Sequence, residues 1–332
     1  MRIAIIRLSS LGDVVHAAAS LQVIRRNVPN SKISMVVDKR FADVLDHQPD
    51  IENVIKIDLK GLLKQRLFLA AVTSEKRRLA AFGPFDLVID LHGMIKSAII
   101  ATILGGKRIG RRVSRESLAK LFYDQLIESP PIDSSVDRVA AMIAGCIGCT
   151  FQPMDADFPK PYLFWDDEDA VTTSTYFSET QRNILFVPGS STPHKDYPFE
   201  HFVQLADMLK ENILICHGSL KELESATRIA EMSPYARVLP RLTLNQLKAA
   251  IGRSDLIIGG DTGPVHIASA CGVPSITLFG AAKVCIKQTE RNRAISALPV
   301  KAVHNGTAHD CMRRIAPGEV ARVAREILGI MS

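Results

Sequence analysis

The chain has 332 residues, more than one hydrophobic core usually organises and enough for two domains of about 150 residues each. Hydrophobic residues make up 47% of it and charged residues 23%, which excludes an intrinsically disordered chain. The net charge of +6 indicates anionic ligands or an anionic membrane surface. Because no zinc-finger or RNA-binding motif accompanies that charge, we expect no nucleic-acid partner.

The N-terminal residues 1–8 contain an apolar run that is too short for the core of a signal peptide, so we expect them to form the first strand of a cytosolic protein. No apolar run reaches the about 20 residues that a membrane-spanning helix needs. The six cysteines follow no disulfide framework, which fits a reducing compartment. Cys146 and Cys149 have CxxC spacing, but we expect them to mark a helix end.

Strands and helices alternate through the first half. The pattern predicts strands at 2–8, 33–37, 54–57 and 86–90, and helices at 14–26, at 41–45 and from residue 95 onward. Such alternation is typical of right-handed βαβ units and a parallel sheet.

Residues 151–182 form a connector rich in proline and acidic side chains, with a polar, helix-like stretch at 168–181. We therefore expect two domains, 1–165 and 166–332. The alternation then restarts, with strands at 183–187 and 213–216 and helices at 200–209, 222–232, 243–251 and 317–330. The helix at 243–251 should open with a capping box.

The stretch 255–280 reads as one strand–turn–helix–strand unit. Gly259 and Gly260 allow a tight turn, Asp261 and Thr262 are residue types that cap helices, and Pro264 suits the first helical position. A glycine-rich turn entering a helix presents free N–H groups and the positive end of the helix dipole, which is a ready site for a phosphate. The alternative is an ordinary βαβ turn with a good cap.

A second loop of this kind opens the second half. After the strand at 183–187 come Gly189, three hydroxyl residues at 190–192 and Lys195, which offer donors and a point charge to phosphate oxygens. An ordinary polar loop is the alternative. Since this loop and the Asp261 turn should leave the same edge of one sheet, we expect them to bind a nucleoside diphosphate together.

The turn at 9–13 joins the first strand to the first helix. It contains only one glycine, so the GxGxxG fingerprint of NAD- and FAD-binding domains is absent. Asp13 lies at a helix N-terminus, where the dipole favours its ionised form. It is either a helix cap or a carboxylate that points into an interdomain cleft and accepts a proton.

A basic segment with interspersed leucines and phenylalanines includes Lys60, Lys64, Arg66 and 76–78. It is either a solvated helix face or a docking surface for an anionic sugar or lipid head group. Asp155 and Asp157 have the spacing that metal-dependent sugar transferases use, but they lie in the connector and not at a strand end. No other cluster of His, Cys or Asp residues in the sequence has convincing metal-ligand spacing, so we expect no metal site.

Three motifs occur together in order: the turn ending in Asp13, Lys195 in the loop of the second half, and the run from Gly259 to His266 followed by Gly-Val-Pro. Together with 90–97 and 115–123, they resemble glycosyltransferase family 9, the lipopolysaccharide heptosyltransferases. The resemblance covers essentially the whole chain. It implies a GT-B fold of class α/β, in which two Rossmann-like parallel-sheet domains face a central cleft and the final helix packs back toward the N-terminal domain.

The resemblance also implies an activity. It is the metal-independent, inverting transfer of L-glycero-D-manno-heptose from ADP-heptose to Kdo of the lipopolysaccharide inner core, with no cofactor beyond this donor. The Ser-Ser-x-Gly-Asp turn is most similar to heptosyltransferase I, which acts on Kdo-lipid A, whereas heptosyltransferase II more often has Trp in that turn. Such an enzyme is expected in the cytoplasm, peripheral to the inner membrane.

Each role below is implied by the resemblance. Asp13 is the base, and the N-terminal domain binds the acceptor. The C-terminal domain binds the ADP-sugar: Glu222 contacts the ribose, Leu242 lines the adenine pocket, and His266 lies one turn inside the phosphate-binding helix. The diphosphate contacts are Ser190, Ser191, Lys195 and the N–H groups of Thr262 and Gly263, and Asp261 also belongs to the donor site. The acceptor contacts are Lys60, Lys64 and Arg115.

Three alternatives stay open. The chain could be heptosyltransferase II, acting on the first heptose. It could be a nucleotide-sugar 2-epimerase of the same fold, which would need no acceptor. It could also be a non-catalytic protein that binds anions or lipid head groups through its basic segment.

Overall fold

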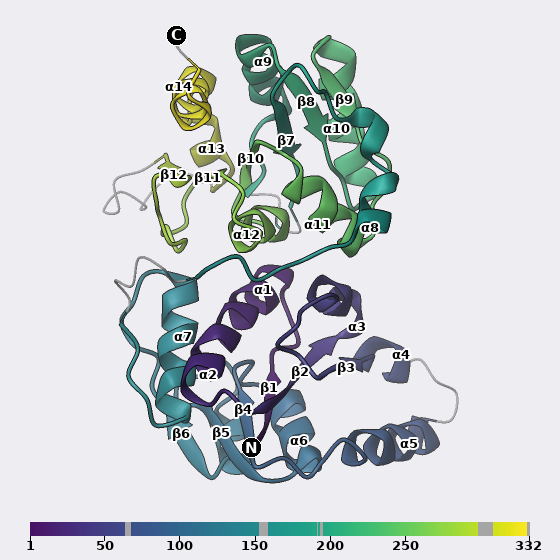
Figure 1. Ribbon diagram of the computed structural model, residues 1–332, viewed down its shortest axis with the longest axis vertical. Coiled ribbons are helices and arrows are strands. Elements are labelled where there is room, and N and C mark those ends of the chain that lie inside the picture. Colours follow the sequence, from purple (N-terminus) through teal and green to yellow (C-terminus); the bar gives the residue numbers. More distant parts are fainter. Residues whose placement is uncertain (64–67, 153–158, 191, 193–194, 298–307, 331–332) are drawn as a thin grey trace. The chain divides into compact units, whose positions relative to one another are not determined.

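A computed structural model of the protein (Figure 1) describes residues 1–63, 68–152, 159–190, 192, 195–297 and 308–330. The chain divides into two compact units, Met1–Tyr162 and Leu163–Ser332. Among the described residues, no helix is both long enough and apolar enough to cross a bilayer.

The first unit contains one sheet of six parallel strands in the order β3-β2-β1-β4-β5-β6. The strands are β1 (Arg2–Ile6), β2 (Lys32–Asp38), β3 (Asn53–Ile57), β4 (Leu87–Asp90), β5 (Lys107–Arg111) and β6 (Gln125–Ile127). The helices are α1 (Leu11–Ala19), α2 (Leu21–Asn27), α3 (Lys39–Ala42), α4 (Leu59–Leu63), α5 (Phe68–Ala80), α6 (Ile95–Leu104) and α7 (Ser135–Cys146), with 3-10 helices η1 (Asp43–Leu45) and η2 (Ser117–Phe122).

Helices cover both faces of this sheet. Helices α1, α2 and α7 contact one another, as do α5 and α6, and the latter two share a buried core with β1, β2, β3 and β4. Strands β1, β2 and β4 are buried on both sides almost throughout, which is why they read as apolar runs in the sequence, whereas the edge strand β3 has the exposed Lys56. Sequence patterns missed β5, because its residues Lys-Arg-Ile-Gly-Arg look like a loop.

The predicted single helix at 14–26 is wrong. It is two helices that divide at Ser20, whose hydroxyl donates to the carbonyl of Ala17 at 2.6 Å. A hydroxyl that bonds to the preceding turn competes with the helical ladder and bends it. Cys146 does end a helix as predicted, and Gly148 follows with φ of 76°.

The second unit repeats the architecture, with a parallel sheet in the order β12-β11-β10-β7-β8-β9. The strands are β7 (Asn183–Val187), β8 (Asn212–Ile215), β9 (Ala236–Val238), β10 (Leu256–Gly260), β11 (Ser275–Phe279) and β12 (Asn292–Ser296). The helices are α8 (Asp167–Val171), α9 (Phe199–Leu209), α10 (Leu220–Met232), α11 (Leu244–Gly252), α12 (Gly263–Ala270), α13 (Ala308–Arg313) and α14 (Pro317–Leu328), with the 3-10 helix η3 (Ser174–Tyr176).

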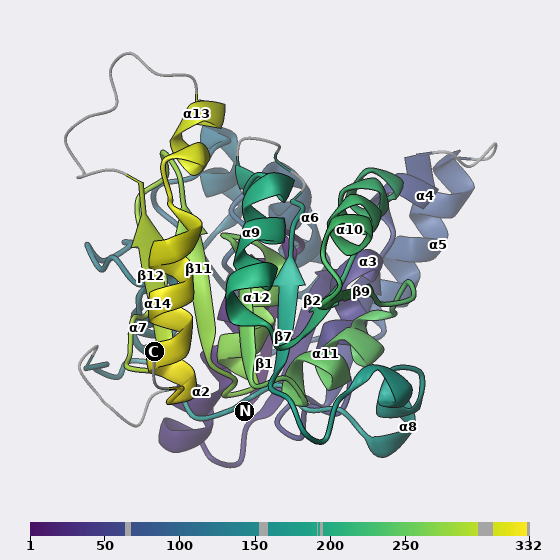
Figure 2. The ribbon, with the colours of Figure 1, turned by 90° about the horizontal axis from the view of Figure 1, so that it is seen from above.

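In this unit α9, α10 and α14 lie side by side (Figure 2) and share one large core with the sheet. Phe186 of β7 and Phe202 of α9 contact each other within it, with ring centroids 5.0 Å apart. Helices α11 and α12 also contact each other. Helix α14 packs on α9, and its docking toward the first unit stays a prediction.

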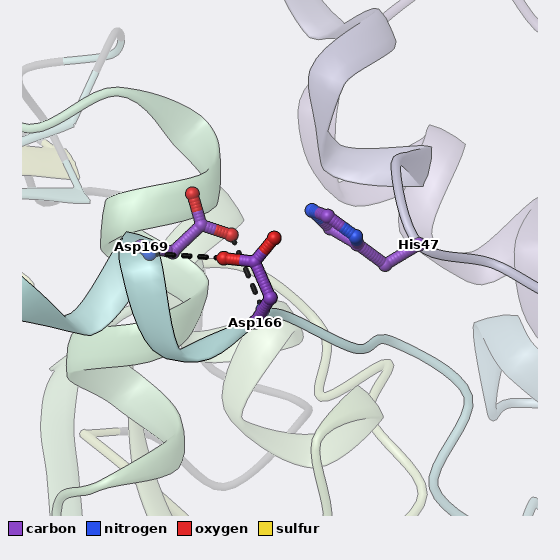
Figure 3. A group of neighbouring side chains, drawn as sticks. All are labelled: His47, Asp166 and Asp169. Carbon is purple, nitrogen blue, oxygen red and sulfur yellow. Dashed lines mark hydrogen bonds between the residues drawn. The ribbon is translucent and has the colours of Figure 1, made fainter.

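The helix expected at 168–181 is wrong in extent, because α8 covers only its first turn. Asp166 caps α8 by accepting from the N–H of Asp169 at 3.0 Å (Figure 3). The hydroxyl groups of Thr173 and Ser174 then donate to carbonyls of α8 at 3.3 and 2.9 Å. These bonds satisfy the end of the helix locally and stop it.

Numbered within each unit, both sheets have strand order 3-2-1-4-5-6. This is the doubly wound order of Rossmann domains, in which ligands bind at the carboxyl ends of the two central strands, where the order reverses. In the first unit these strands are β1 and β4, and in the second they are β7 and β10. The turns with Asp13, Lys195 and Asp261 follow three of these four strands. The molecule therefore has the two Rossmann-like domains of the GT-B class.

Candidate active site

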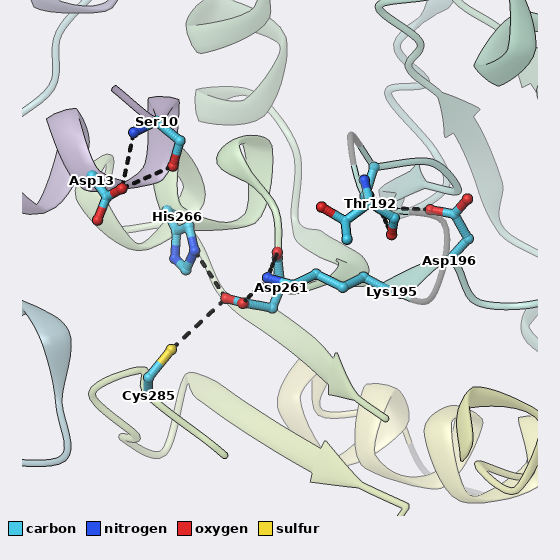
Figure 4. Close-up of polar contacts among 9 residues, drawn as sticks. Ser10, Asp13, Thr192, Lys195, Asp196, Asp261, His266 and Cys285 are labelled. Carbon is cyan, nitrogen blue, oxygen red and sulfur yellow. Dashed lines mark hydrogen bonds and ion pairs between the residues drawn. The ribbon is translucent and has the colours of Figure 1, made fainter. Parts of the chain in front are cut away.

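The turn after β1 fixes Asp13 through the start of α1. Asp13 is the third helical residue, and its Oδ2 accepts from the N–H of Ser10 at 2.9 Å and from the Ser10 hydroxyl at 3.0 Å (Figure 4). Asp13 therefore does cap the helix, as one reading of the sequence held. The side chain is still 40% exposed, so it also remains open to a ligand.

Arg7, directly after β1, pairs with the other oxygen of Asp13, with Nη2 lying 2.5 Å from Oδ1. Burial alone would raise the pKa of Asp13, but the charge of Arg7 and the hydrogen bonds from Ser10 outweigh it and lower that pKa. Arg7 is itself held in place, because its Nη1 donates to the carbonyl of Leu91 after β4. Asp13 is thus an ionised, positioned carboxylate at neutral pH.

The turn after β4 is organised by the buried carboxylate of Asp90. Its Oδ1 accepts from the N–H groups of His92 at 2.8 Å and Gly93 at 3.0 Å, and Tyr123 donates its hydroxyl to Oδ2 at 2.6 Å. Gly110 lies directly under the Tyr123 ring, where an added Cβ would come within 2.2 Å of it. These contacts hold the turn after β4 against β5 and Tyr123.

His92 lies beside this charged pair as a neutral group. Burial, together with the charges of Arg7 and Lys96, lowers the pKa of His92 to about 4, against the opposing effect of Asp13 and a bond to the backbone of Ser9. Its Nε2 is buried and has no hydrogen-bond partner among the described residues. Sequence reasoning assigned His92 no role.

In the second unit the loops after β7 and β10 meet, as predicted. Lys195 Nζ lies 2.5 Å from Oδ2 of Asp261 and 3.2 Å from its carbonyl oxygen (Figure 4). The carbonyl of Lys195 also packs on Gly260, where a Cβ would approach it to 2.5 Å, so only glycine fits there without a shift. Two anion-friendly loops thus lie at one sheet edge, joined by an ion pair.

Asp261 is an ion-pair residue and not the helix cap that its type suggested. Its Oδ1 contacts His266 Nε2 at 3.1 Å and Cys285 Sγ at 3.9 Å. Burial would raise the pKa of Asp261, but hydrogen bonds and charge from His266 and Lys195 hold it well below the usual range. The cap position belongs to Thr262, whose buried hydroxyl has no partner among the described residues.

The start of α12 places backbone donors beside this pair. Gly263 is its first residue and Pro264 its second, one position later than predicted. The helix ends at Ala270 with Cys271 as its C-cap, and Gly272 follows with φ of 74°, as the sequence indicated. The N–H groups of its first turn have no partner within the helix, and the helix dipole is positive at this end.

Ser190 is fixed within its loop. Its hydroxyl lies 2.7 Å from Oδ1 of Asp196 and 2.6 Å from the carbonyl of Thr192, and it accepts from the Thr192 N–H at 3.1 Å. Since one hydroxyl hydrogen serves one acceptor at a time, Asp196 and Thr192 compete for it. Ser191 lies outside the described residues.

Glu222 also reaches this edge, from the start of α10. Its side chain packs on Gly189, where a Cβ would come within 2.2 Å of Glu222 Cγ, and its Oε2 accepts from the N–H of Gly218 at 2.6 Å. Leu242 is half-buried, directly before the Thr243 cap of α11. The capping box predicted there is present, with Thr243 and Gln246 bonded at 2.9 and 3.2 Å.

The two expected acceptor contacts that the structure describes, Lys60 and Arg115, have exposed side chains. Lys60 is exposed on α4 after β3, Arg115 is exposed after β5, and Lys64 lies outside the described residues. Both β3 and β5 lie two strands from β1, or roughly 10 Å away, so their carboxyl ends share the edge that carries Asp13.

Sequence reasoning missed several polar groups around the site: Arg7, His92, Arg111, Arg138, Asp196 and Cys285. For Arg7 there was a signal, because a lone charge after an apolar strand lies at the strand end that binds ligands. The others come from distant segments and carried no local pattern.

Comparison with known proteins agrees with this geometry. The model of glycosyltransferase family 9 (heptosyltransferase) matches residues 72–310. Lipopolysaccharide heptosyltransferase 1 of Campylobacter coli is 29% identical over 346 residues, covering 99% of each chain. The same-named protein of Escherichia coli K12 is 27% identical over 289 residues, covering 84% of this chain and 88% of that one. The structure of E. coli heptosyltransferase WaaC with ADP-2-deoxy-2-fluoro heptose superposes with a TM-score of 0.78 at 24% identity, covering 98% of this chain and 99% of that one. The chain therefore belongs to glycosyltransferase family 9, the heptosyltransferases.

Proposed function

We propose that this enzyme transfers L-glycero-D-manno-heptose from ADP-heptose to Kdo of the lipopolysaccharide inner core, on Kdo-lipid A, with inversion. The observation that carries the proposal is the Lys195–Asp261 pair at the N-terminus of α12, where β7 and β10 end. A cation and a helix N-terminus at one point suit a diphosphate leaving group. The names of the C. coli and E. coli relatives support the choice of heptosyltransferase 1.

On the donor side, Lys195 would exchange part of its contact with Asp261 for the diphosphate oxygens. The N–H groups of Thr262 and Gly263 and the hydroxyls of Ser190 and Ser191 would supply further donors. Asp261 would keep Lys195 aimed at the helix N-terminus, with His266 holding the other carboxylate oxygen. These groups stabilise the negative charge that grows on ADP as the glycosidic bond breaks.

The nucleoside would bind at the neighbouring strand ends. Glu222 lies between the loops after β7 and β8, where a carboxylate can accept hydrogen bonds from ribose hydroxyls, as in other Rossmann domains. Leu242 supplies half-buried apolar surface for the adenine after β9.

On the acceptor side, Asp13 would accept the proton of the attacking hydroxyl. The acceptor oxygen forms a bond to the anomeric carbon while the bond from that carbon to the diphosphate breaks, and ADP leaves with the electron pair. A single displacement of this kind inverts the configuration and needs one base. Lys60, Lys64 and Arg115 would contact the negative groups of the acceptor.

We also propose that the enzyme works at the cytoplasmic face of the inner membrane, through a patch that we name the leucine surface. It consists of Leu118 and Leu121 on η2, which are 61% and 81% exposed, and the nearby Val113, which is 67% exposed. A 3-10 helix has three residues per turn, so Leu118 and Leu121 project from the same side. Arg112, Arg115 and Lys120 alternate with them, and exposed apolar groups among cations are typical of proteins that bind anionic lipid surfaces.

The experiment is incubation of the purified protein with ADP-heptose and a panel of acceptors, followed by mass spectrometry. We expect Kdo-lipid A to gain one heptosyl residue. Transfer only to an acceptor that already carries heptose would assign the enzyme to the type II reaction. Turnover of the donor without acceptor would indicate an epimerase. Binding without any turnover would leave only a non-catalytic role.

A further inference from the structure

A cavity of about 70 Å³ opens in the first unit beside Asp13. Six polar residues line it: Arg7, Asp13, His16, Arg111, Ser135 and Arg138. Leu91, Val139 and Met142 supply an apolar wall. A cavity of this volume has room for a small polar group such as a carboxylate, since one water molecule takes up about 30 Å³ of liquid. All of these residues lie between β1 and α7, so the cavity belongs to one unit.

The charges of the lining do not balance. Three guanidinium groups face one carboxylate, and that carboxylate, Asp13, already pairs with Arg7. Arg138 donates to two uncharged oxygens, the Ile132 carbonyl at 2.9 Å and the Ser135 hydroxyl at 2.8 Å. The cavity thus carries an excess of positive charge in the absence of a ligand.

Of the three arginines, Arg111 has the least complete hydrogen bonding. Its Nε is buried and, within the part of the chain that the structure describes, has no hydrogen-bond partner. Burial and the charges of Arg7 and Arg138 lower the pKa of Arg111. A buried donor without a partner costs free energy, and so does the close approach of like charges. A bound anion would relieve both.

We infer that this cavity binds the carboxylate of the acceptor sugar, with Arg111 as the principal contact and Arg138 and Arg7 beside it. Arginine holds a carboxylate through two parallel hydrogen bonds, and the free Nε of Arg111 offers one of them. Because Asp13 lines the same cavity, a sugar fixed by its carboxylate presents its hydroxyls to that base. The inference rests on the proposed function, whose acceptor Kdo carries a carboxylate. It assigns recognition of that group to Arg111 and Arg138, in addition to Lys60, Lys64 and Arg115.

Direct binding tests the inference apart from heptose transfer. The full-length protein is titrated, with NMR detection, with a Kdo methyl glycoside, with the methyl ester of the same sugar, and with inorganic phosphate. We expect the acid to bind about 10–100-fold more tightly than its uncharged ester. Arg111→Gln should lose that preference. The control is Lys32→Gln, which removes an exposed charge at the start of β2 in the same unit and should keep the preference.

Three results would overturn the inference: equal binding of acid and ester by the wild type, an unchanged preference in folded Arg111→Gln, or tighter binding of phosphate than of the acid. Thermal melting shows whether the variant is folded. If Arg111→Gln does not fold, Arg111→Lys keeps the charge but removes the Nε donor, and it should reduce the preference by about 10-fold. Wild type that binds the acid as expected but transfers no heptose would contradict the proposed function and not this inference.

Discussion

Nη2 of Arg7 lies 2.5 Å from Oδ1 of Asp13, so the residue best placed to act as the base is also one half of an ion pair. This pair, together with the Ser10 bonds, keeps Asp13 ionised and aimed, but it also makes the carboxylate a weaker proton acceptor. Such a base depends on its position more than on its pKa.

Replacing Asp13 with Asn tests its role as the base. Asn keeps an oxygen that can accept from Ser10 but cannot take up a proton, so we expect kcat for heptose transfer to fall about 10²–10⁴-fold with little change in the KM for ADP-heptose. Steady-state kinetics measure this. Activity within a few-fold of wild type, in a variant with an unchanged melting curve, would exclude Asp13 as the base.

Arg7→Gln should change the pH dependence of the reaction. Without the neighbouring positive charge the pKa of Asp13 rises, so the carboxylate becomes protonated at a higher pH. We expect the acid limb of the profile of kcat/KM against pH to move to higher pH by about one unit. Arg112→Gln, which removes an exposed charge nearby, serves as the control. A limb that stays in place would show that Arg7 does not control the base.

Lys195→Gln should weaken binding of the diphosphate of ADP-heptose. Gln keeps a polar end but loses the charge, so we expect kcat/KM for ADP-heptose to fall about 10–100-fold, whereas the KM for the acceptor changes little. Lys210→Gln removes an exposed lysine after α9 in the same unit and should leave both constants unchanged. An equal loss in the two variants would indicate a general charge effect.

Asp261→Asn should affect both stability and donor binding. The lowered pKa of Asp261 means that its ionised form stabilises the fold, fully at pH values above the usual carboxyl pKa of about 4 and progressively less as the pH falls below it. We expect the variant to lose about 1–2 kcal/mol of unfolding free energy at pH 7, since Lys195 and His266 lose a charged partner.

Urea denaturation at pH 7 and pH 3 measures this, and the difference between wild type and Asp261→Asn should shrink at the lower pH. Asp255→Asn is the matched control for donor kinetics, because Asp255 precedes β10 and pairs with Arg182, whereas Asp261 follows the strand. A difference in unfolding free energy that persists unchanged at pH 3 would contradict the assigned pKa.

Substitutions in the leucine surface should reduce membrane binding. Leu118→Ser with Leu121→Glu removes apolar area and adds a negative charge, so we expect sedimentation with vesicles rich in anionic phospholipid to fall at least about 10-fold. Leu220→Glu is the control, because Leu220 is 85% exposed but lies on the second unit. Equal sedimentation of both variants would remove η2 as the contact.

The sequence by itself determined the architecture and the locations of the chemistry. Buried parallel strands read as apolar runs, and turns that bind ligands carry glycine, hydroxyl and acidic residues, so β1, β7 and β10 and the turns after them could be found from local pattern alone. The capping box at Thr243 and the helix end at Gly272 were predictable for the same reason, since each depends on neighbouring residues only.

Only the tertiary structure decided which groups act together. Asp261 has the residue type of a cap, yet it pairs with a lysine 66 positions away, a contact that exists only because β7 and β10 are neighbours. Arg111 and Arg138 look like surface charges in the sequence and become cavity residues because α7 packs against α1. Local pattern reports the backbone a residue prefers, whereas the partners of a side chain depend on strand order and helix packing, which bring together residues that are distant in the sequence.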